Sequence, residues 1–268
     1  MNPATKGAKH LLRLTVLVAV LPILFVAAGA VGTKLGLWGW KFGFGTLTVG
    51  WASSAAFIGL FTGLVALYTA AFAGFRRLWP LALVSLLIPA AVLWGFAGLK
   101  AKAAANPGHD VATSWQPPLE FSPRTMIARG ADSNPVHPDP RSTFGVKEAE
   151  NWTDRRAHVV NARICPGAKA TRLGDEQAQV HARVLAAMRA EGLDIVTDDP
   201  AAGRIEGVAT SYWYEFKDDV AARITRDGGA WLVDLRSVSR VGRSDLGANC
   251  ARVTAIANRL YPRRAESR

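Results

Sequence analysis

The first 105 residues of this 268-residue chain contain no aspartate and no glutamate, and all 21 acidic residues follow Ala105. The front part has nine lysines and arginines, whereas the rear part has the other 23, so the charges are about +9 and +2. A basic chain often binds nucleic acid. Here the excess flanks apolar segments and no basic patch carries stacking aromatics, which disfavours nucleic acid. The asymmetry predicts a membrane region, residues 1–105, followed by a nearly balanced soluble region.

Cysteine and the spacings typical of cofactor sites are also scarce. The chain has two cysteines and five histidines, and the histidines show no ligand spacing with cysteines or carboxylates. This disfavours a metal site. The chain lacks a glycine-rich phosphate loop, a nucleophile elbow and a dinucleotide fingerprint. We therefore expect no metal and no cofactor, and assign no catalytic residue.

Three uncharged apolar runs occupy the membrane region. They contain 20, 34 and 22 residues and span positions 14–33, 42–75 and 78–99. A hydrocarbon core about 30 Å thick requires roughly 20 helical residues. Each run therefore holds one helix in the lipid bilayer, and we expect these helices near residues 12–32, 48–73 and 79–99.

The first run has an alternative interpretation as a cleaved signal peptide. Lys6, Lys9 and Arg13 precede it, and Ala28-Gly29-Ala30 resembles a cleavage site. Its length and the spans that follow favour an uncleaved anchor. Five basic residues against four then put the N-terminus in the cytoplasm. With three spans, the C-terminal domain is expected in the periplasm, and the protein in the inner membrane of a bacterium.

Small residues recur at every fourth position of the second span, at Ala55, Gly59 and Gly63. Such a stripe lets helices approach closely. We favour packing within the three-helix bundle, and homodimerisation is the alternative. No acidic residue or histidine lies within a span, which counts against a transporter. Trp38 and Trp40 suit an interfacial aromatic belt.

Residues 106–156 are rich in proline and lack periodicity. Trp115, Phe121, Phe144 and Trp152 give this segment apolar anchors that a disordered tether would not have. We expect a strap that lies over the folded core and belongs to the soluble domain.

Residues 157–268 predict an α+β core. Helices are expected at 175–191, with Val180, Val184, Ala187 and Met188 buried, and at 244–260, with Ser244 as its cap. Strands are expected at 193–197, 204–216, 218–226 and 231–238, with Asp227-Gly-Gly as a hairpin turn. The pattern predicts an antiparallel sheet of about four strands with helices packed on one face.

The hairpin has one apolar face and one charged face. Pairing through a tight turn puts Val220, Ala222 and Ile224 in the core with Trp231, Val233 and Leu235. The other face places Asp219 and Arg223 against Asp234 and Arg236, within cross-strand reach.

The densest group of polar residues spans the end of the last strand and the start of the last helix. A helix N-terminus with nearby guanidinium groups can bind an anion. Asp218 and Asp219 open the neighbouring strand, close enough to pair with Arg236. The candidate ligand-binding residues are Arg236, Ser239, Arg240, Arg243, Asp245, Asn249, Asp218 and Asp219. The alternative is that these residues only hold the corner in shape.

The same segment carries a family resemblance. Residues 216–224 (FKDDVAARI) and 233–249 (VDLRSVSRVGRSDLGAN) closely resemble a bacterial family known as domain of unknown function 1499. Residues 109–113, 117–121 and 204–210 are similar to its other motifs, so the resemblance covers about residues 107–260. It implies no established activity. The chain departs from the usual pattern at Cys165 and Cys250, which argues against a general catalytic role for cysteine.

A disulfide between Cys165 and Cys250 is permitted in the periplasm, but two buried or half-buried thiols are favoured. The first functional hypothesis is a membrane-anchored envelope module that binds or scaffolds a polar or anionic ligand or a protein partner. The alternatives are a hydrolase-like enzyme that uses Asp218, Asp219 or Asp245, and a purely structural subunit of a membrane complex.

Overall fold

The computed structural model describes residues 3–72, 76–139, 141, 143, 154 and 156–261. The chain forms two compact units. The membrane unit comprises Met1–Lys100 together with Ser211–Glu215, and the sheet unit comprises Ala101–Thr210 and Phe216–Arg268.

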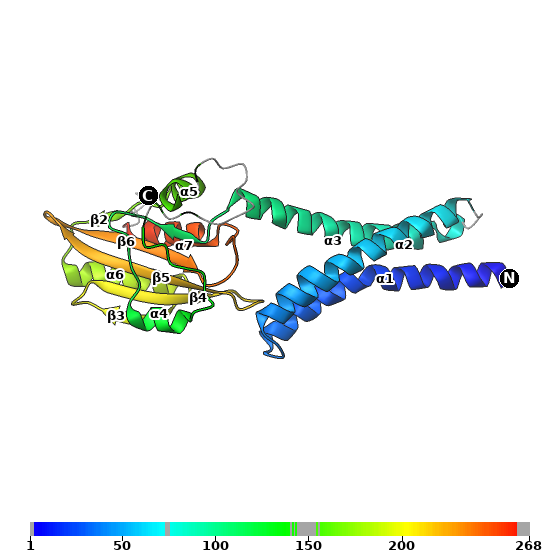
Figure 1. Ribbon diagram of the computed structural model, residues 1–268, viewed down its shortest axis with the longest axis horizontal. Helices are drawn as coiled ribbons and strands as arrows, with labels where there is room; N and C mark the ends of the chain where they lie inside the picture. Colours follow the sequence, from blue (N-terminus) through cyan, green and yellow to red (C-terminus); the bar gives the residue numbers. More distant parts are fainter. Residues whose placement is uncertain are drawn as a thin grey trace, which may run out of the picture. The chain divides into compact units, whose positions relative to one another are not determined.

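Among the described residues, three helices are long and apolar enough to cross a membrane: His10–Lys34, Lys41–Phe72 and Trp79–Ala105. The first lies within α1 (Pro3–Lys34), the second consists of the π-helical η1 (Lys41–Ala52) and α2 (Ser53–Phe72), and the third is α3 (Trp79–Ala105) (Figure 1). A short 3₁₀ turn, η2 (Arg76–Leu78), precedes α3. The second helix begins seven residues before the expected position 48, because residues 42–47 contain no proline or charge to end it.

The small-residue stripe of α2 packs within the chain. A Cβ added at Gly63 would lie 2.7 Å from the carbonyl oxygen of Ser85 on α3. One added at Gly59 would lie 3.2 Å from Cβ of Pro89 on α3 and 3.5 Å from Cα of Ala19 on α1. Both glycines therefore permit close helix contacts inside one chain. Homodimerisation through the same stripe stays a prediction.

The sheet unit contains one antiparallel sheet. Its strand order is β1-β6-β5-β4-β3, and β2 also pairs with β6. The strands are β1 (Asp110–Ala112), β2 (Thr171–Leu173), β3 (Asp194–Asp199), β4 (Arg204–Thr210), β5 (Lys217–Asp227) and β6 (Ala230–Ser239). In the described part of the chain the sheet has six strands and not about four, because two three-residue segments, β1 and β2, pair with β6.

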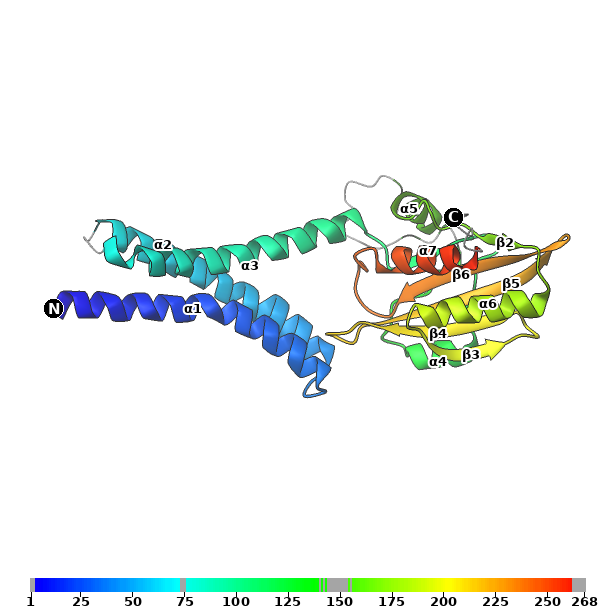
Figure 2. The ribbon, with the colours of Figure 1, turned by 180° about the vertical axis from the view of Figure 1, so that it is seen from behind.

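Helices α6 (Gln177–Ala190) and α7 (Ala248–Leu260) cover one face of the sheet (Figure 2). The predicted stripe of α6, from Val180 to Met188, is buried against β4, β5 and β6. The predicted faces of the hairpin are also confirmed, since Ala222 pairs with Leu235 on the core face and Arg223 with Asp234 on the charged face. This face holds the main hydrophobic core.

The strap covers the opposite face. Leu119 and Phe121 pack on Ala221 and Val238, and α4 (Pro123–Arg129) follows them along the chain (Figure 1). A further short helix, α5 (Ala157–Ile164), packs near β1 and Trp115. Phe144 and Trp152, the other expected anchors, lie outside the described residues. The charged face of the hairpin is therefore buried under the strap.

Two element boundaries differ from the expected ones. The strand expected over 204–216 ends at Thr210, because Ser211–Glu215 cluster with the membrane helices. The last helix begins at Ala248 and not at Ser244, because Gly247 has a left-handed backbone with φ of +87°. Asp245 accepts hydrogen bonds from the backbone N–H groups of Gly247 and Asn249 and caps this helix.

Candidate functional site

The end of β6 divides the candidate residues between the two faces of the sheet. Successive side chains of a strand point to opposite faces. Arg236 and Arg240 therefore contact the strap, whereas Ser237 and Ser239 contact α7. The residues predicted at one corner therefore divide into those that face the strap and those that face α7, with the sheet between them.

The first cluster centres on Arg236, which is fully buried. Its guanidinium binds the Asp110 carboxylate through two hydrogen bonds of 2.9 and 2.6 Å. It also donates to the carbonyl oxygens of Leu119 and His137, both at 2.7 Å, and stacks 5.0 Å from the Trp115 ring. The expected partners Asp218 and Asp219 are wrong, because β1 pairs with β6 and brings Asp110 within reach of Arg236.

The second group lies on the same face around Asp219, whose side chain is fully buried. Arg240 binds both of its carboxylate oxygens, at 2.9 and 2.7 Å, and Arg129 of α4 binds it at 2.5 Å. Arg240 also donates to the carbonyl oxygen of Ala128, and Arg129 donates to that of Asn134. One carboxylate thus fixes the C-terminal end of α4 to the sheet.

A third group, around Glu206 of β4, was missed by the sequence analysis. This buried carboxylate accepts hydrogen bonds from the Ser122 backbone N–H and hydroxyl, at 2.6 and 2.5 Å, and from the Thr125 hydroxyl at 2.5 Å. Arg204 donates to it at 3.0 Å. Burial alone would raise the pKa of Glu206, but these hydrogen bonds outweigh burial and lower it. The sequence signals were Ser122 before Pro123, a helix-start pattern, and a glutamate in the middle of a β-strand pattern.

On the other face, Asn249 of α7 connects the helix to β6. Its side-chain oxygen accepts from the Ser237 hydroxyl at 2.6 Å, and its amide donates to Ser239 and to the His109 carbonyl oxygen. Arg252 donates to the same Asn249 oxygen and binds Asp218 at 2.9 Å. Asn249 is therefore a fully satisfied buried amide.

The carboxylates of Asp218, Asp219 and Asp245, which were candidates for acid–base chemistry, all bind other groups of the fold. Asp218 and Asp219 are in the ion pairs described above, and Asp245 caps α7. Burial raises the pKa of Asp245, and nearby Asp218 adds to this, while the capping N–H groups oppose it. Arg243 is an exposed residue of the loop between β6 and α7.

Two histidines lie beside the Asp110–Arg236 pair. The rings of His109 and His137 are 5.7 Å apart, and both residues are buried. Desolvation by burial lowers the pKa of each, although Asp110 opposes the shift. Within the described ranges, no group of three or more His, Cys, Asp or Glu residues could hold a metal ion.

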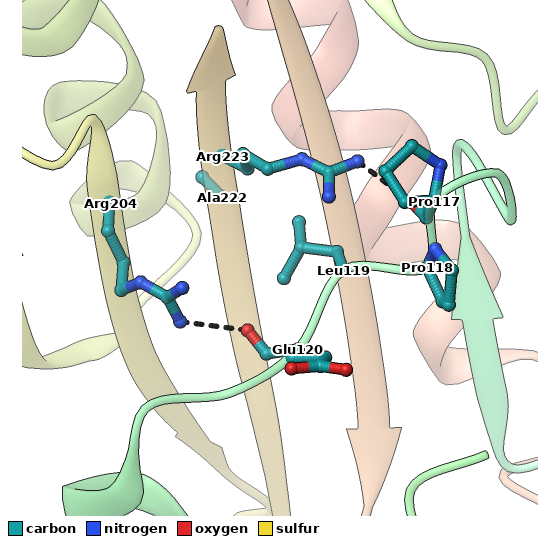
Figure 3. Close-up of a pocket in the computed structure, with 7 residues that line it drawn as sticks. All are labelled: Pro117, Pro118, Leu119, Glu120, Arg204, Ala222 and Arg223. Atoms are coloured by element: carbon teal, nitrogen blue, oxygen red, sulfur yellow. Dashed lines mark hydrogen bonds between the residues drawn. The ribbon is translucent and has the colours of Figure 1, made fainter. Parts of the chain in front are cut away.

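A hollow of about 300 Å³ lies on the strap face (Figure 3). Arg204 and Arg223 line it, but Arg204 donates to the Glu120 carbonyl oxygen at 2.8 Å and Arg223 to that of Pro117 at 3.0 Å (Figure 3). Arg223 also binds Asp234 at 2.9 Å. Both guanidinium groups that line the hollow therefore bind backbone carbonyl groups of the strap.

A disulfide joins Cys165, which follows α5, to Cys250 of α7, with Cα atoms 5.5 Å apart. The sequence favoured free thiols, because Cys250 lies on the buried stripe of the last helix and Cys165 in a loop before Pro166. That prediction is wrong, since the fold brings the two cysteines together across 85 positions. The bond ties the segment before β2 to the last helix.

Comparison with known proteins identifies the family of this segment. Residues 135–260 match the model of a family described as protein of unknown function (DUF1499). This segment belongs to the DUF1499 family. The match covers β2 to β6, α6 and α7, and it begins after the strap motifs at 109–113 and 117–121. No curated protein and no solved structure matched the chain.

Proposed function

We propose that this DUF1499 protein is a membrane-anchored scaffolding module whose sheet unit binds a protein partner. The observation that carries the proposal is the use of the motif arginines inside the fold. The Arg236 guanidinium donates to Asp110 and to two backbone carbonyl groups, and its side chain is 1% exposed. Four of its five N–H groups are thus bound inside the fold, so this desolvated guanidinium holds structure and is not presented to a free anion.

Two of the buried carboxylates, Glu206 and Asp219, together fix the position of α4. Glu206 holds its N-terminal end through Ser122 and Thr125, and Asp219 holds its C-terminal end through Arg129. Seven-residue helices are marginal alone, so these contacts keep α4 folded. Its outer side presents Met126 and Ile127, which are 43% and 81% exposed. A rigid exposed apolar pair suits a protein contact.

Native gels of mild-detergent extracts test the proposal in cells that express the protein naturally. We expect the wild-type chain to migrate in a complex heavier than the purified chain. Ile127→Glu should release it, because the change buries a charge at the contact. Tyr261→Glu is the matched control, since Tyr261 is a 55% exposed aromatic away from α4. Migration of the wild type alone, or an unchanged complex in Ile127→Glu, contradicts the proposal.

A thermal-shift titration with phosphate and pyrophosphate tests the competing anion site. We expect no saturable stabilisation of the full chain. Saturable, salt-sensitive stabilisation that Arg243→Ala abolishes would favour an anion receptor instead. Arg243 is the appropriate variant because it is exposed and its loss leaves the buried pairs intact.

We also infer that the protein lies in the inner membrane of a bacterium with its sheet unit in the periplasm. The disulfide supports an oxidising compartment, and the basic residues before α1 support a cytoplasmic N-terminus. Alkaline phosphatase fused after the last residue should be active, and green fluorescent protein at the same point should be dark. The reverse pattern would place the sheet unit in the cytoplasm.

A further inference from the structure

The loop between β4 and β5 belongs to the membrane unit. Ser211–Glu215 cluster with the membrane helices, although the strands on both sides belong to the sheet unit. The Tyr214 hydroxyl lies 2.8 Å from the hydroxyl of Thr48, and its ring packs edge-on against Phe44 at 5.1 Å. These contacts attach the loop to η1.

The same loop also contacts the end of α1. Lys34, the last residue of α1, lies 3.6 Å from the Glu215 carboxylate and 4.9 Å above the Tyr212 ring. Lys34 ends the first apolar run and Lys41 begins the second, so the turn between them marks the edge of the hydrocarbon core. The loop is thus attached to the turn that we expect at the boundary between membrane and water.

Two aromatic side chains of the loop are largely exposed. Tyr212 is 66% exposed and Trp213 is 52% exposed, and their rings pack edge-on 4.9 Å apart. Both side chains combine an apolar ring with a polar group, so they are stabilised in the headgroup layer of a bilayer. Trp38 and Trp40, in the turn after α1, are aromatic residues of the same kind.

We propose that Tyr212 and Trp213 form an interfacial anchor that inserts into the lipid headgroup layer beside the α1–η1 turn. The chain then enters the membrane surface a second time, between β4 and β5. The partner is the bilayer itself, so this inference is independent of a protein partner at α4. It also accounts for the early end of β4, since three β-forming aromatics leave the sheet for the membrane surface.

Site-specific fluorescence on the full chain tests this anchor. The two natural cysteines are paired, so Trp213→Cys provides one thiol for an environment-sensitive dye. Ala201→Cys is the matched control, because Ala201 is exposed and precedes β4, whereas Trp213 follows it. Both proteins are reconstituted in vesicles of phosphatidylethanolamine and phosphatidylglycerol. Some vesicles carry lipids brominated near the headgroup, and others carry lipids brominated deep in the acyl chain.

We expect the dye at position 213 to be quenched most by bromine near the headgroup, and several-fold less by aqueous iodide than the dye at 201. Equal iodide quenching at the two positions would show the loop in water and overturn the proposal. Strongest quenching by the deep bromine would place the loop in hydrocarbon and overturn it as well. Tyr214→Phe in the labelled protein removes the hydroxyl bonded to Thr48 and should raise iodide quenching at 213.

Discussion

Replacing Arg236 by methionine removes the guanidinium that joins the strap to the sheet. The variant leaves the Asp110 carboxylate buried without its cation, and the carbonyl oxygens of Leu119 and His137 without their donor. Breaking a buried ion pair by removing one partner costs about 3–5 kcal/mol. For a domain of this size, that loss corresponds to a fall in melting temperature of roughly 6–20 °C.

Hydrogen exchange measured by mass spectrometry on the full chain isolates this effect. Peptides from β5 and β6 report the free energy at which the sheet unit opens, whatever the membrane helices do. We expect the free energy of opening measured at these peptides to fall by about 3–5 kcal/mol. Asp110→Asn keeps the shape of the site and is the second variant if Arg236→Met does not fold. Arg172→Met is the control, because the Arg172–Asp227 pair is largely exposed and contributes at most about 1 kcal/mol.

One result would refute the reasoning. Unchanged protection of β6 in Arg236→Met, equal to that of the Arg172→Met control, would mean that the buried guanidinium does not stabilise the fold. The positive charge of Arg236 would then serve to bind a ligand, and an anion site at Arg236 would again be the favoured hypothesis.

Three further predictions concern other parts of the chain. Changing Cys165 and Cys250 to serine opens a loop of 85 residues, and exchange at β6 should show a loss of about 4–5 kcal/mol. Gly63→Ala should lower the melting temperature of the membrane unit in detergent, because the new Cβ meets the α3 backbone. Gly95→Ala should not, because nothing lies within 4 Å of that position. Burial lowers the pKa of His109 from 6.5, so the folded state binds fewer protons than the unfolded state below pH 6.5. Stability should therefore be full above pH 6.5 and decline as the pH falls towards the folded pKa, by up to about 1.4 kcal/mol per pH unit. His109→Gln should reduce that slope in a pH series of exchange measurements.

Parts of the candidate site were readable from strand alternation. Arg223 opposite Asp234 follows from the Asp227-Gly-Gly turn, because a two-residue turn fixes the register of a hairpin. The same alternation separates Arg236 from Ser237 and Ser239. These residues were predicted at one corner because they are adjacent in sequence. The alternation of side chains continues to the end of β6, however, and puts them on opposite faces of the sheet.

The partners of the buried charges were not readable in this way. Asp110 lies 126 positions from Arg236, and Ser122 lies 84 positions from Glu206. Many carboxylates of the chain could pair with each arginine, and local periodicity does not rank contacts across such distances. The strap also has no repeating pattern that reveals which residues face the sheet.

The sequence by itself determined the membrane-length helices, the buried stripe of α6 and the hairpin of β5 and β6. Each depends on local quantities, namely the length of an uncharged run, helical periodicity and turn chemistry. Only the tertiary structure decided that the strap buries the charged face of the sheet, that Cys165 meets Cys250, and that the β4–β5 loop joins the membrane unit. These features depend on which distant segments meet when the chain folds. A buried charge is stable only when it is paired, and the fold decides which partner lies within reach.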